Sequence, residues 1–507
     1  MPPSAGSKSK IRIAPSWILL NLPERLDGHR QIAWNRVLFL ACATIFGAVL
    51  RIRHLGARSL WMDESATAAI TSLDWSSFWK LIFSREMNMS AYYLLLRAFP
   101  FLHRSEVLLR LPSVLFGCGL ICSIWLLSKH VFDESRQLLR AASVLLVVVN
   151  GFLIAYSQEA RGYAMAVCLL VASTWVLALL IKTGKHRATW CVLALAALYT
   201  HFYAVLWIAP QVWAIWITHR KLGWKFFGRI VVVAAVGLIP LIVFLCRTRG
   251  GQLDWVPKLT LHYLLDVFVQ IAGYSPIALA LLVLGSVLGS IALWRSGDVF
   301  SRTIVLEAVL PILVLLICSP IHPLFVPRFL IFAIPFLTLT AMVGFGGLRM
   351  DYGVLAFAAL FVTMLVVGNE SASKGDWKTM TEYLCSQPDQ AVAFWPAMQR
   401  LPFWYYSRSV PGCRNAITSE HRELTLADFG GNKREFAAKL CASNEKSIVM
   451  VMESEWHGKM PATIAQCYVP AGTTTRNGLE MLWLQRSTGI ETTSKPNRTV
   501  IARTARN

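Results

Sequence analysis

Long apolar stretches separated by short polar connections fill the chain between residues 37 and 368. A helix that crosses a bilayer needs about 20 mostly apolar residues. Eleven stretches approach this length, and they are centred near Thr44, Gly119, Leu146, Ala172, Leu195, Gln211, Gly237, Leu284, Ile312, Leu337 and Ala359. The pattern therefore predicts an all-α polytopic membrane domain with about eleven transmembrane helices.

The connections between these stretches differ in charge. With the N-terminus placed in the cytoplasm, the cytoplasmic connections carry Lys129, Arg136, Arg140, Lys182, Lys185, Arg187, Arg220, Lys221, Lys225, Arg229, Arg295 and Arg302. This distribution follows the positive-inside rule. The first apolar run, Val37 to Leu50, has no small-residue cleavage site, so we expect it to stay as an anchor. An odd number of spans then places the C-terminal part outside the cytoplasm.

One apolar segment, Ser90–Leu102, is only about 13 residues long and contains Arg97. Runs of 10 to 14 apolar residues are usually too short to span, so we expect an interfacial helix here. A crossing at this point would put the loops of Asp63 and Glu159 on opposite faces of the membrane.

The pattern divides the chain into four parts. We expect a cytoplasmic tail over 1–36, a transmembrane domain over 37–368 with a large outer loop over 51–110, an extracytoplasmic domain over 369–486 and a disordered tail over 487–507. Within the third part, Asp376–Cys385 is typical of a helix, and Ala391–Trp395 and Ser447–Met452 are typical of strands. A small α/β fold is the expected result.

Four of the eleven cysteines, Cys385, Cys413, Cys441 and Cys467, follow the last apolar stretch. They show no Cys-x-x-Cys or Cys/His zinc spacing, which favours two disulfides in an oxidising compartment. Three pairings are possible, and the sequence does not choose among them.

Composition agrees with a membrane protein of multi-pass type. The chain has 507 residues, of which 55% are apolar and 15% charged, and its mean hydropathy is +0.52. Ordinary soluble chains carry roughly 25% charged residues. The formal charge of +21 is spread over short connections rather than over a basic face interleaved with aromatics. We therefore expect anionic lipid head groups or phosphate-bearing lipids as partners, and no nucleic acid.

Polar side chains gather in the predicted outer loops. The segments are Leu60-Trp61-Met62-Asp63-Glu64, Asn88–Tyr93, Glu106–Ser113, Tyr156–Tyr163, Tyr199–Tyr203 and His322–Arg328. Each has a simpler structural interpretation. Acidic pairs favour helix N-termini, arginines snorkel at interfaces, and histidines such as His201 are often satisfied interfacial residues. No dedicated set of metal ligands is evident, so we expect no cofactor, although a divalent metal stays possible.

The order of these motifs resembles that of the GT-C fold polytopic glycosyltransferases, in particular the bacterial relatives of protein O-mannosyltransferase and of the lipid A aminoarabinose transferase. The resemblance covers about Arg51 to Tyr406, and includes Leu60–Glu64, Tyr92-Tyr93, Arg110-Leu111-Pro112-Ser113, Ser157–Tyr163, Pro327-Arg328-Phe329 and Gly375–Lys378. Many relatives have a His-Pro-Pro-like entry before the paired tyrosines, where this chain has Met87-Asn88-Met89-Ser90-Ala91.

The resemblance implies transfer of a sugar from a polyprenyl-phosphate donor to a lipid, glycan or protein acceptor on the extracytoplasmic face of the inner membrane, usually with inversion. It implies Asp63 as the general base, since Asp63 looks like the family's catalytic aspartate. Fixed positive charge at the departing phosphate would come from Arg110, Arg161 and Arg328.

The resemblance also suggests further site residues. Glu64 is grouped with Asp63 as a catalytic candidate, and Glu64 and Glu159 would orient the base or an arginine. Tyr92 and Tyr93 would line the donor pocket or pack at the interface. Tyr163 and His201, which stand in two other outer motifs, are further supporting candidates. Two alternatives stay open, namely a transporter or flippase of lipid-linked sugars and a non-catalytic envelope assembly protein. The nearly charge-free spans are unlike those of transporters, which place ionisable groups near the midplane.

Overall fold

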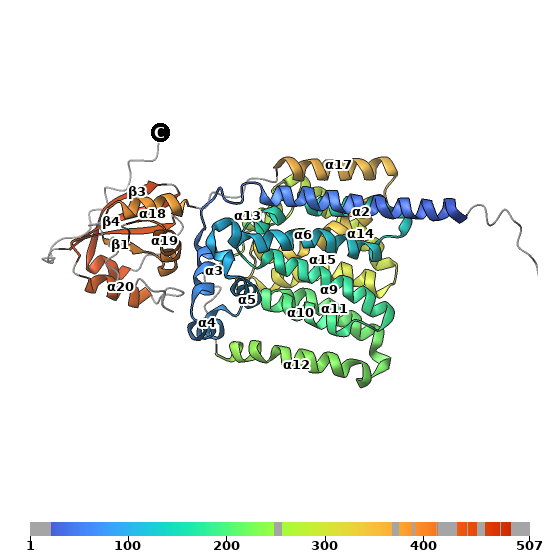
Figure 1. The fold of residues 1–507 in the computed structure, drawn as a ribbon, viewed down its shortest axis with the longest axis horizontal. Helices are drawn as coiled ribbons and strands as arrows, with labels where there is room; N and C mark the ends of the chain where they lie inside the picture. The colour runs from blue at the N-terminus through green and yellow to red at the C-terminus, as the bar shows by residue number, and fades with distance from the viewer. Residues whose placement is uncertain are drawn as a thin grey trace, which may run out of the picture.

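The computed structural model describes residues 22–247, 256–367, 375–387, 391–411, 413, 433–443, 445–453, 462–476 and 478–487. Figure 1 shows a bundle of long helices that lie side by side, and a smaller domain containing a sheet at one end of the bundle. The expected tail over 487–507 lies outside the described residues except for its first residue. Of the expected N-terminal tail, residues 22–36 are described and are helical.

Each predicted apolar stretch is centred in a separate helix. These are α2 (Leu22–Ile52), α6 (Glu106–Val131), α7 (Gln137–Val149), α9 (Tyr163–Thr183), α10 (Arg187–Thr200), α11 (Ala204–His219), α12 (Trp224–Arg247), α14 (Pro276–Arg295), α15 (Val299–Cys318), α16 (Ile334–Phe345) and α17 (Met350–Val367). A multi-pass, predominantly helical membrane domain is confirmed.

Helix length and composition give a smaller number of candidate crossings than the sequence pattern. Among the described residues, eight helices are long and apolar enough to cross a membrane, or nine when the bent pair formed by α7 and α8 (Gly151–Ser157) is one span. Helices α10 and α11 have only 14 and 16 residues. The count of eleven stays a prediction.

The bend between α7 and α8 has a local cause. Asn150 stands between the two helices, which meet at 55°. Its side-chain oxygen accepts a hydrogen bond from the Leu153 amide (3.0 Å), and its side-chain nitrogen donates to the Ile271 carbonyl (3.1 Å) at the end of α13 (Leu261–Ile271). The side chain thus gives a hydrogen-bond partner to an amide at the start of α8 and to a carbonyl at the end of α13. This bend positions the segment that follows α8.

Helices α14 and α16 pack unusually closely. A Cβ atom at Gly289 would collide with the Thr340 carbonyl, and one at Gly344 would collide with the Gly285 carbonyl. Small residues allow this approach in membrane helices, where packing rather than the hydrophobic effect drives association.

Five short helical segments connect α2 to α6 at the end of the bundle that faces the sheet domain (Figure 1). They are α3 (Met62–Ser72), α4 (Trp75–Leu81), the π-helix η1 (Ile82–Glu86), α5 (Ser90–Ala98) and the 3₁₀ helix η2 (Pro100–Arg104). Helix α5 has nine residues, far fewer than a crossing requires. Arg97 donates to the Thr71 and Leu73 carbonyls (3.0 and 2.6 Å) and its guanidinium lies over the Trp75 ring. The charge that interrupts the apolar run therefore holds α5 against its neighbours.

The C-terminal domain is α/β, as predicted. Its elements are α18 (Trp377–Cys385), β1 (Ala391–Phe394), α19 (Arg400–Ser407), α20 (Lys433–Ala442), β2 (Ser447–Glu453), β3 (Tyr468–Arg476) and β4 (Leu479–Arg486). The strand order is β1-β2-β4-β3, with β1 and β2 parallel and the other pairs antiparallel. Strand β2 is buried along most of its length, whereas β3 is an exposed edge strand.

The two expected disulfides are present. Cys385 pairs with Cys413, and Cys441 pairs with Cys467. Of the three possible pairings, the protein therefore adopts the one in which each cysteine bonds to its neighbour along the chain. The first bridge ties α18 to the segment after α19. The second ties α20 to the residue before β3.

Candidate functional site

The candidate site begins at the first turn of α3, which carries Asp63 and Glu64. The acidic pair therefore lies at a helix N-terminus, as the simpler structural interpretation predicted, where the helix dipole favours negative charge. Their carboxylates nevertheless have different partners. Asp63 contacts arginines from two distant segments, and Glu64 contacts a third.

Asp63 lies between Arg328 and Arg161. The Arg328 guanidinium is 3.1 Å from the Asp63 carboxylate, and a second guanidinium nitrogen, that of Arg161, is 3.9 Å away. The three side chains are 13% to 18% exposed. Arg161 follows α8, and Arg328 lies in a short 3₁₀ turn before α16. Residues more than 260 positions apart thus form one cluster, with two positive charges and one negative.

Arg161 is held in place by several further contacts. Its Nη1 donates to the Asp63 carbonyl (3.2 Å), the Thr67 hydroxyl (3.3 Å) and the Tyr93 hydroxyl (3.4 Å). Its Nε is buried and has no hydrogen-bond partner among the described residues. Because a buried donor without a partner is costly, this nitrogen is well suited to an anionic ligand.

Arg110, a phosphate ligand in the sequence-based prediction, has all its donors engaged inside the protein. Its Nε and Nη2 donate to the two Glu64 carboxylate oxygens, both at 2.7 Å. Its remaining donors bond to the carbonyls of Leu55, Arg58 and Ser59 at 2.6 to 3.2 Å. A guanidinium has five N–H donors, and all five are used inside the protein. Arg110 therefore organises the loop before α3.

Glu64, the other acid of the first turn, is buried and fully engaged with protein partners. Its side chain is 1% exposed. Besides the bidentate pair with Arg110, its carboxylate accepts a hydrogen bond from the Ala160 amide (2.8 Å). This contact ties the start of α3 to the residue beside Arg161. The expectation that Glu64 orients an arginine agrees with this geometry.

The paired tyrosines of α5 are both buried and both touch the cluster. The Tyr92 hydroxyl bonds to the Ser113 hydroxyl (2.8 Å), which donates to the Arg161 carbonyl (3.0 Å). The Tyr93 hydroxyl accepts from Arg161. Burial raises the pKa of both phenols, so they stay protonated. Tyr92 fixes the backbone of residue 161, and Tyr93 fixes its side chain.

His201 and Tyr163 form an aromatic wall beside the cluster. The His201 ring lies 5.5 Å from the Tyr163 ring, 5.3 Å from Phe329 and 5.2 Å from Phe332. Burial and the nearby charges of Arg161 and Arg328 lower the pKa of His201 to about 3. Its Nδ1 accepts from the Tyr203 amide (3.3 Å), and its buried Nε2 has no partner among the described residues. The imidazole is therefore neutral, with its proton on Nε2.

Glu159 lies next to a second feature, a cavity of about 530 Å³. Glu64, Arg110, Glu159, Trp61 and Tyr274 are among the residues that line it. The Glu159 carbonyl accepts from the Arg161 amide (2.8 Å). Glu159 therefore lines the same cavity as the Glu64–Arg110 ion pair.

Comparison with solved structures reveals the fold. The structure superimposes on apo ArnT from Cupriavidus metallidurans with a TM-score of 0.56 at 12% sequence identity, covering 90% of this chain and 98% of that one. The same protein bound to undecaprenyl phosphate gives a TM-score of 0.50 at 11% identity, with 92% and 99% covered. The chain has the GT-C glycosyltransferase fold.

Other comparisons are weaker. The archaeal oligosaccharyltransferase AglB from Archaeoglobus fulgidus, in complex with an inhibitory peptide and a dolichol-phosphate, has a TM-score of 0.49 at 10% identity, covering 88% of this chain and 74% of that one. No protein-family model matches the chain, and no curated protein matches it. The GT-C fold is thus recognised from structure, and motif order was the only sign of it in the sequence.

One carboxylate near this cluster was not predicted. Glu86, at the end of η1, accepts a long hydrogen bond from the Tyr93 hydroxyl (3.4 Å). Burial raises its pKa, and the charge of Arg161 partly opposes the rise. The only signal in the sequence was an acid six residues before the paired tyrosines.

The described residues contain no group of three His, Cys, Asp or Glu side chains arranged to hold a metal ion. The absence of a metal cofactor from the candidate site stays a prediction. The positive charge of the candidate site comes from Arg161 and Arg328.

Proposed function

We propose that this protein is a membrane glycosyltransferase that moves a sugar from a polyprenyl-phosphate donor to a lipid, glycan or protein acceptor. The observation that supports this most directly is the position of Asp63 between Arg161 and Arg328. The GT-C fold agrees with it, and the similar ArnT structure is of a protein bound to undecaprenyl phosphate.

The two arginines supply the charge that the reaction needs. As the bond between the anomeric carbon and the phosphate oxygen breaks, the oxygen keeps the electron pair and the phosphate gains negative charge. Guanidinium groups hold phosphate through paired N–H donors. Fixed positive charge at the leaving group stabilises an oxocarbenium-like transition state.

Asp63 is the proposed general base. The acceptor hydroxyl forms a bond to the anomeric carbon and gives its proton to the Asp63 carboxylate. In the structure this carboxylate pairs with both arginines and offsets one of their two positive charges. A donor phosphate would take over those contacts and free the carboxylate for the acceptor. Attack opposite to the departing phosphate gives inversion.

The orientation forms part of the proposal. The disulfides Cys385–Cys413 and Cys441–Cys467 favour an oxidising compartment for the C-terminal domain. That domain packs on the end of the bundle that carries α3 (Figure 1). We therefore propose an inner-membrane protein whose site and C-terminal domain, expected over 369–486, face away from the cytoplasm.

The test is sugar transfer in proteoliposomes that contain the full chain, a set of undecaprenyl-phosphate sugars (hexose, pentose and amino sugar) and envelope extract as acceptor. The wild type should transfer one sugar, and Asp63→Asn should lower turnover by at least about 100-fold, since general-base catalysis contributes roughly 10²- to 10⁴-fold. Asp266→Asn, an exposed acid on α13, is the matched control. Full turnover by Asp63→Asn would exclude Asp63 as the base. A wild type that flips the donor without cleaving it would favour the transporter.

A further inference from the structure

A second cavity lies far from Asp63, between α10 and α12, and has a volume of about 540 Å³. It begins at Gly184, directly after α9, whereas the candidate site lies at the start of that helix. Helix α9 has 21 residues, which corresponds to a length of about 30 Å. The two features therefore lie at opposite ends of the bundle, and this cavity has no part in the chemistry described above.

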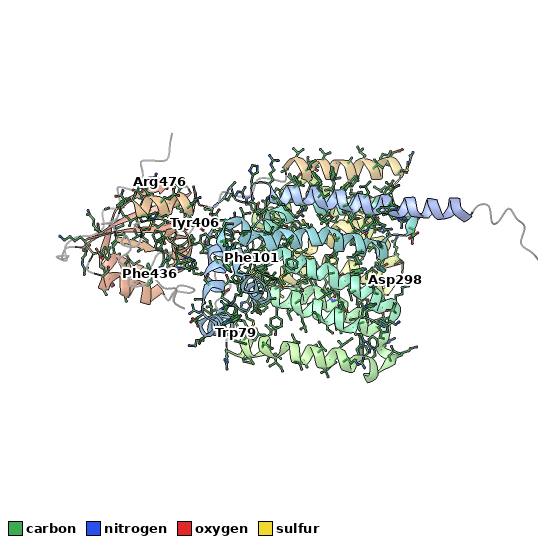
Figure 2. The ribbon with its side chains drawn as sticks, viewed as in Figure 1. Trp79, Phe101, Asp298, Tyr406, Phe436 and Arg476 are labelled. Atoms are coloured by element: carbon green, nitrogen blue, oxygen red, sulfur yellow. A yellow bond between two sulfur atoms is a disulfide. The ribbon has the colours of Figure 1, made fainter. Side chains whose placement is uncertain are left out.

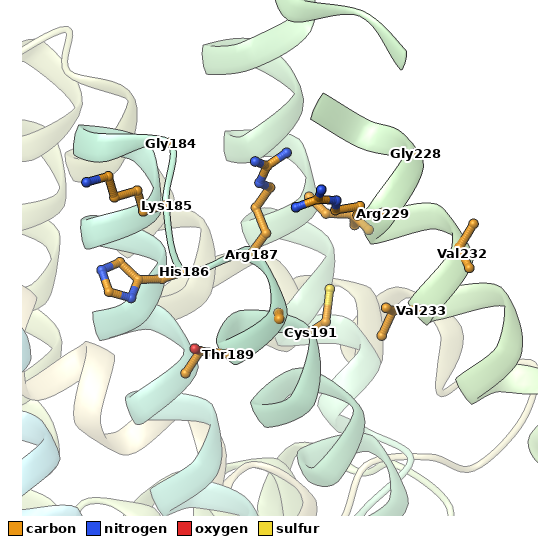
Figure 3. A pocket seen from close by; sticks show the side chains of 12 residues that line it. Gly184, Lys185, His186, Arg187, Thr189, Cys191, Gly228, Arg229, Val232 and Val233 are labelled. Atoms are coloured by element: carbon orange, nitrogen blue, oxygen red, sulfur yellow. The ribbon is translucent and has the colours of Figure 1, made fainter. Parts of the chain in front are cut away.

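The mouth of the cavity is basic. Lys185, His186, Arg187 and Arg229 line it, and no acidic residue does. Figure 3 shows these side chains on the turn before α10, on the first residue of α10 and on the first part of α12. Lys185 and Arg229 are exposed. Arg187 is fixed, because it donates to the Phe226 carbonyl (3.1 Å) and its guanidinium lies 4.7 Å from the Phe226 ring centroid.

One side of the cavity is apolar. Its apolar lining residues are Cys191, Ile230, Val232 and Val233. Helix α12 packs little against the rest of the bundle, since only 6% of its apolar window is buried. The cavity thus combines a cationic rim at the membrane end with an apolar wall that faces the lipid.

The two helices touch on both sides of this cavity. At one end Arg187 meets Phe226. At the other, the Tyr199 hydroxyl donates to the Gly237 carbonyl (2.6 Å), and a Cβ at Gly237 would collide with Leu195. These contacts fix α12 against α10 on both sides of the cavity.

We propose that this cavity binds one anionic phospholipid of the surrounding membrane. The phosphate would be held by Lys185, Arg229 and Arg187, and an acyl chain would lie along Ile230 and Val233. Charge complementarity selects this occupant, because basic pockets between transmembrane helices attract anionic head groups. A free anion would use the rim but not the apolar wall. A neutral lipid would use the wall but not the rim.

Native mass spectrometry of the full-length protein in detergent tests the proposal. With equal amounts of phosphatidylglycerol and phosphatidylcholine added, we expect one retained phosphatidylglycerol, favoured about tenfold. The double variant Lys185→Gln/Arg229→Gln should lower its retention about tenfold. The matched control is Lys221→Gln/Arg295→Gln, which removes two exposed cations that do not line the cavity. Equal loss in both double variants would overturn the proposal, because it would indicate general surface attraction.

A second variant tests the apolar wall without changing charge. Val233→Trp should fill the cavity and lower phosphatidylglycerol retention, and glycerol phosphate should compete poorly. Strong competition by glycerol phosphate, together with full retention in Val233→Trp, would show a simple anion site and overturn lipid binding. Equal retention of phosphatidylcholine would overturn the selection by charge.

Discussion

Neighbouring side chains in the first turn of α3 have separate tasks. Asp63 is partly exposed and meets Arg161 and Arg328, whereas Glu64 is buried and pairs with Arg110. Consecutive residues of a helix point about 100° apart. The Asp63 carboxylate is therefore partly open to the surface, while the Glu64 carboxylate faces the protein interior. The hydrogen bond from the Ala160 amide to the Glu64 carboxylate connects the Glu64–Arg110 pair to the segment that carries Arg161.

This division predicts that Arg110 contributes to stability rather than to phosphate binding. Arg110→Ala would leave the Glu64 carboxylate buried without its charged partner, at a cost of about 3–5 kcal/mol. We expect a clear loss of thermal stability in detergent, measured by intrinsic fluorescence. Undecaprenyl phosphate should bind with unchanged affinity to the fraction that is still folded.

The matched comparison for Arg110→Ala is the double variant Glu64→Gln/Arg110→Gln, which removes both charges and should recover part of the stability. A stable Arg110→Ala variant with weakened phosphate binding would contradict this assignment and restore the role suggested by the sequence.

At this scale the sequence indicated candidate residues, but it did not show how their side chains pair. Asp63, Arg161 and Arg328 were candidates because they stand in polar motifs at the ends of apolar stretches, and the structure brings them together. Arg110 stood in an equally good motif. Its five acceptors come from Glu64 and from three carbonyls over 50 residues earlier. Such convergence depends on tertiary contacts, which motif order does not contain.

At the scale of elements, a polar network joins four of the long helices inside the bundle. Gln211 of α11 donates to Glu307 of α15 (2.9 Å) and to Thr174 of α9 (3.0 Å), and its side-chain oxygen accepts from Trp190 of α10 (2.7 Å). Thr174 also donates to Glu307 (2.8 Å). Glu307 is thus an exception to the nearly charge-free spans, but its partners are helix side chains. The network holds helices together and does not by itself indicate transport.

We predict that Gln211→Leu destabilises the bundle by about 1–2 kcal/mol, because it removes interhelical hydrogen bonds and leaves polar groups unpaired. Thermal unfolding in detergent measures this loss. Gln270→Leu, which removes only a bond to the exposed Asp266 on the same helix, should change stability little. Equal stability of both variants would mean that the network does not contribute to helix association.

The elements themselves were largely predictable, since apolar periodicity is local. All eleven predicted centres fall in separate helices. Strands β3 and β4 were not predicted. Strand β3 is rich in threonine and exposed, so it lacks the buried apolar run that revealed β2. The bend at Asn150 was also missed, because it depends on a contact with Ile271.

At the scale of the whole molecule, the C-terminal domain touches the loop that carries Asp63. Tyr406 of α19 accepts a hydrogen bond from the Leu60 amide and donates to the Glu106 carboxylate, both at 2.6 Å. Figure 2 shows Tyr406 on the side of the domain nearest the bundle. The Trp377 amide donates to the Ser59 hydroxyl (3.0 Å), which in turn donates to the Gly375 carbonyl (3.3 Å). Leu60 is three residues before Asp63.

We therefore expect Tyr406→Phe to slow sugar transfer from a distance. The phenylalanine ring fills the same space, but the Leu60 amide and Glu106 lose their partner, at about 1–3 kcal/mol for a buried unpaired group. If the position of Asp63 depends on this contact, kcat should fall roughly tenfold while KM for the lipid donor stays unchanged, since each 1.4 kcal/mol corresponds to a factor of ten. Tyr405→Phe makes the same chemical change one residue earlier and should leave kcat unaltered. A Tyr406→Phe enzyme with wild-type kcat would show that the C-terminal domain rests on the α3 loop without positioning its aspartate.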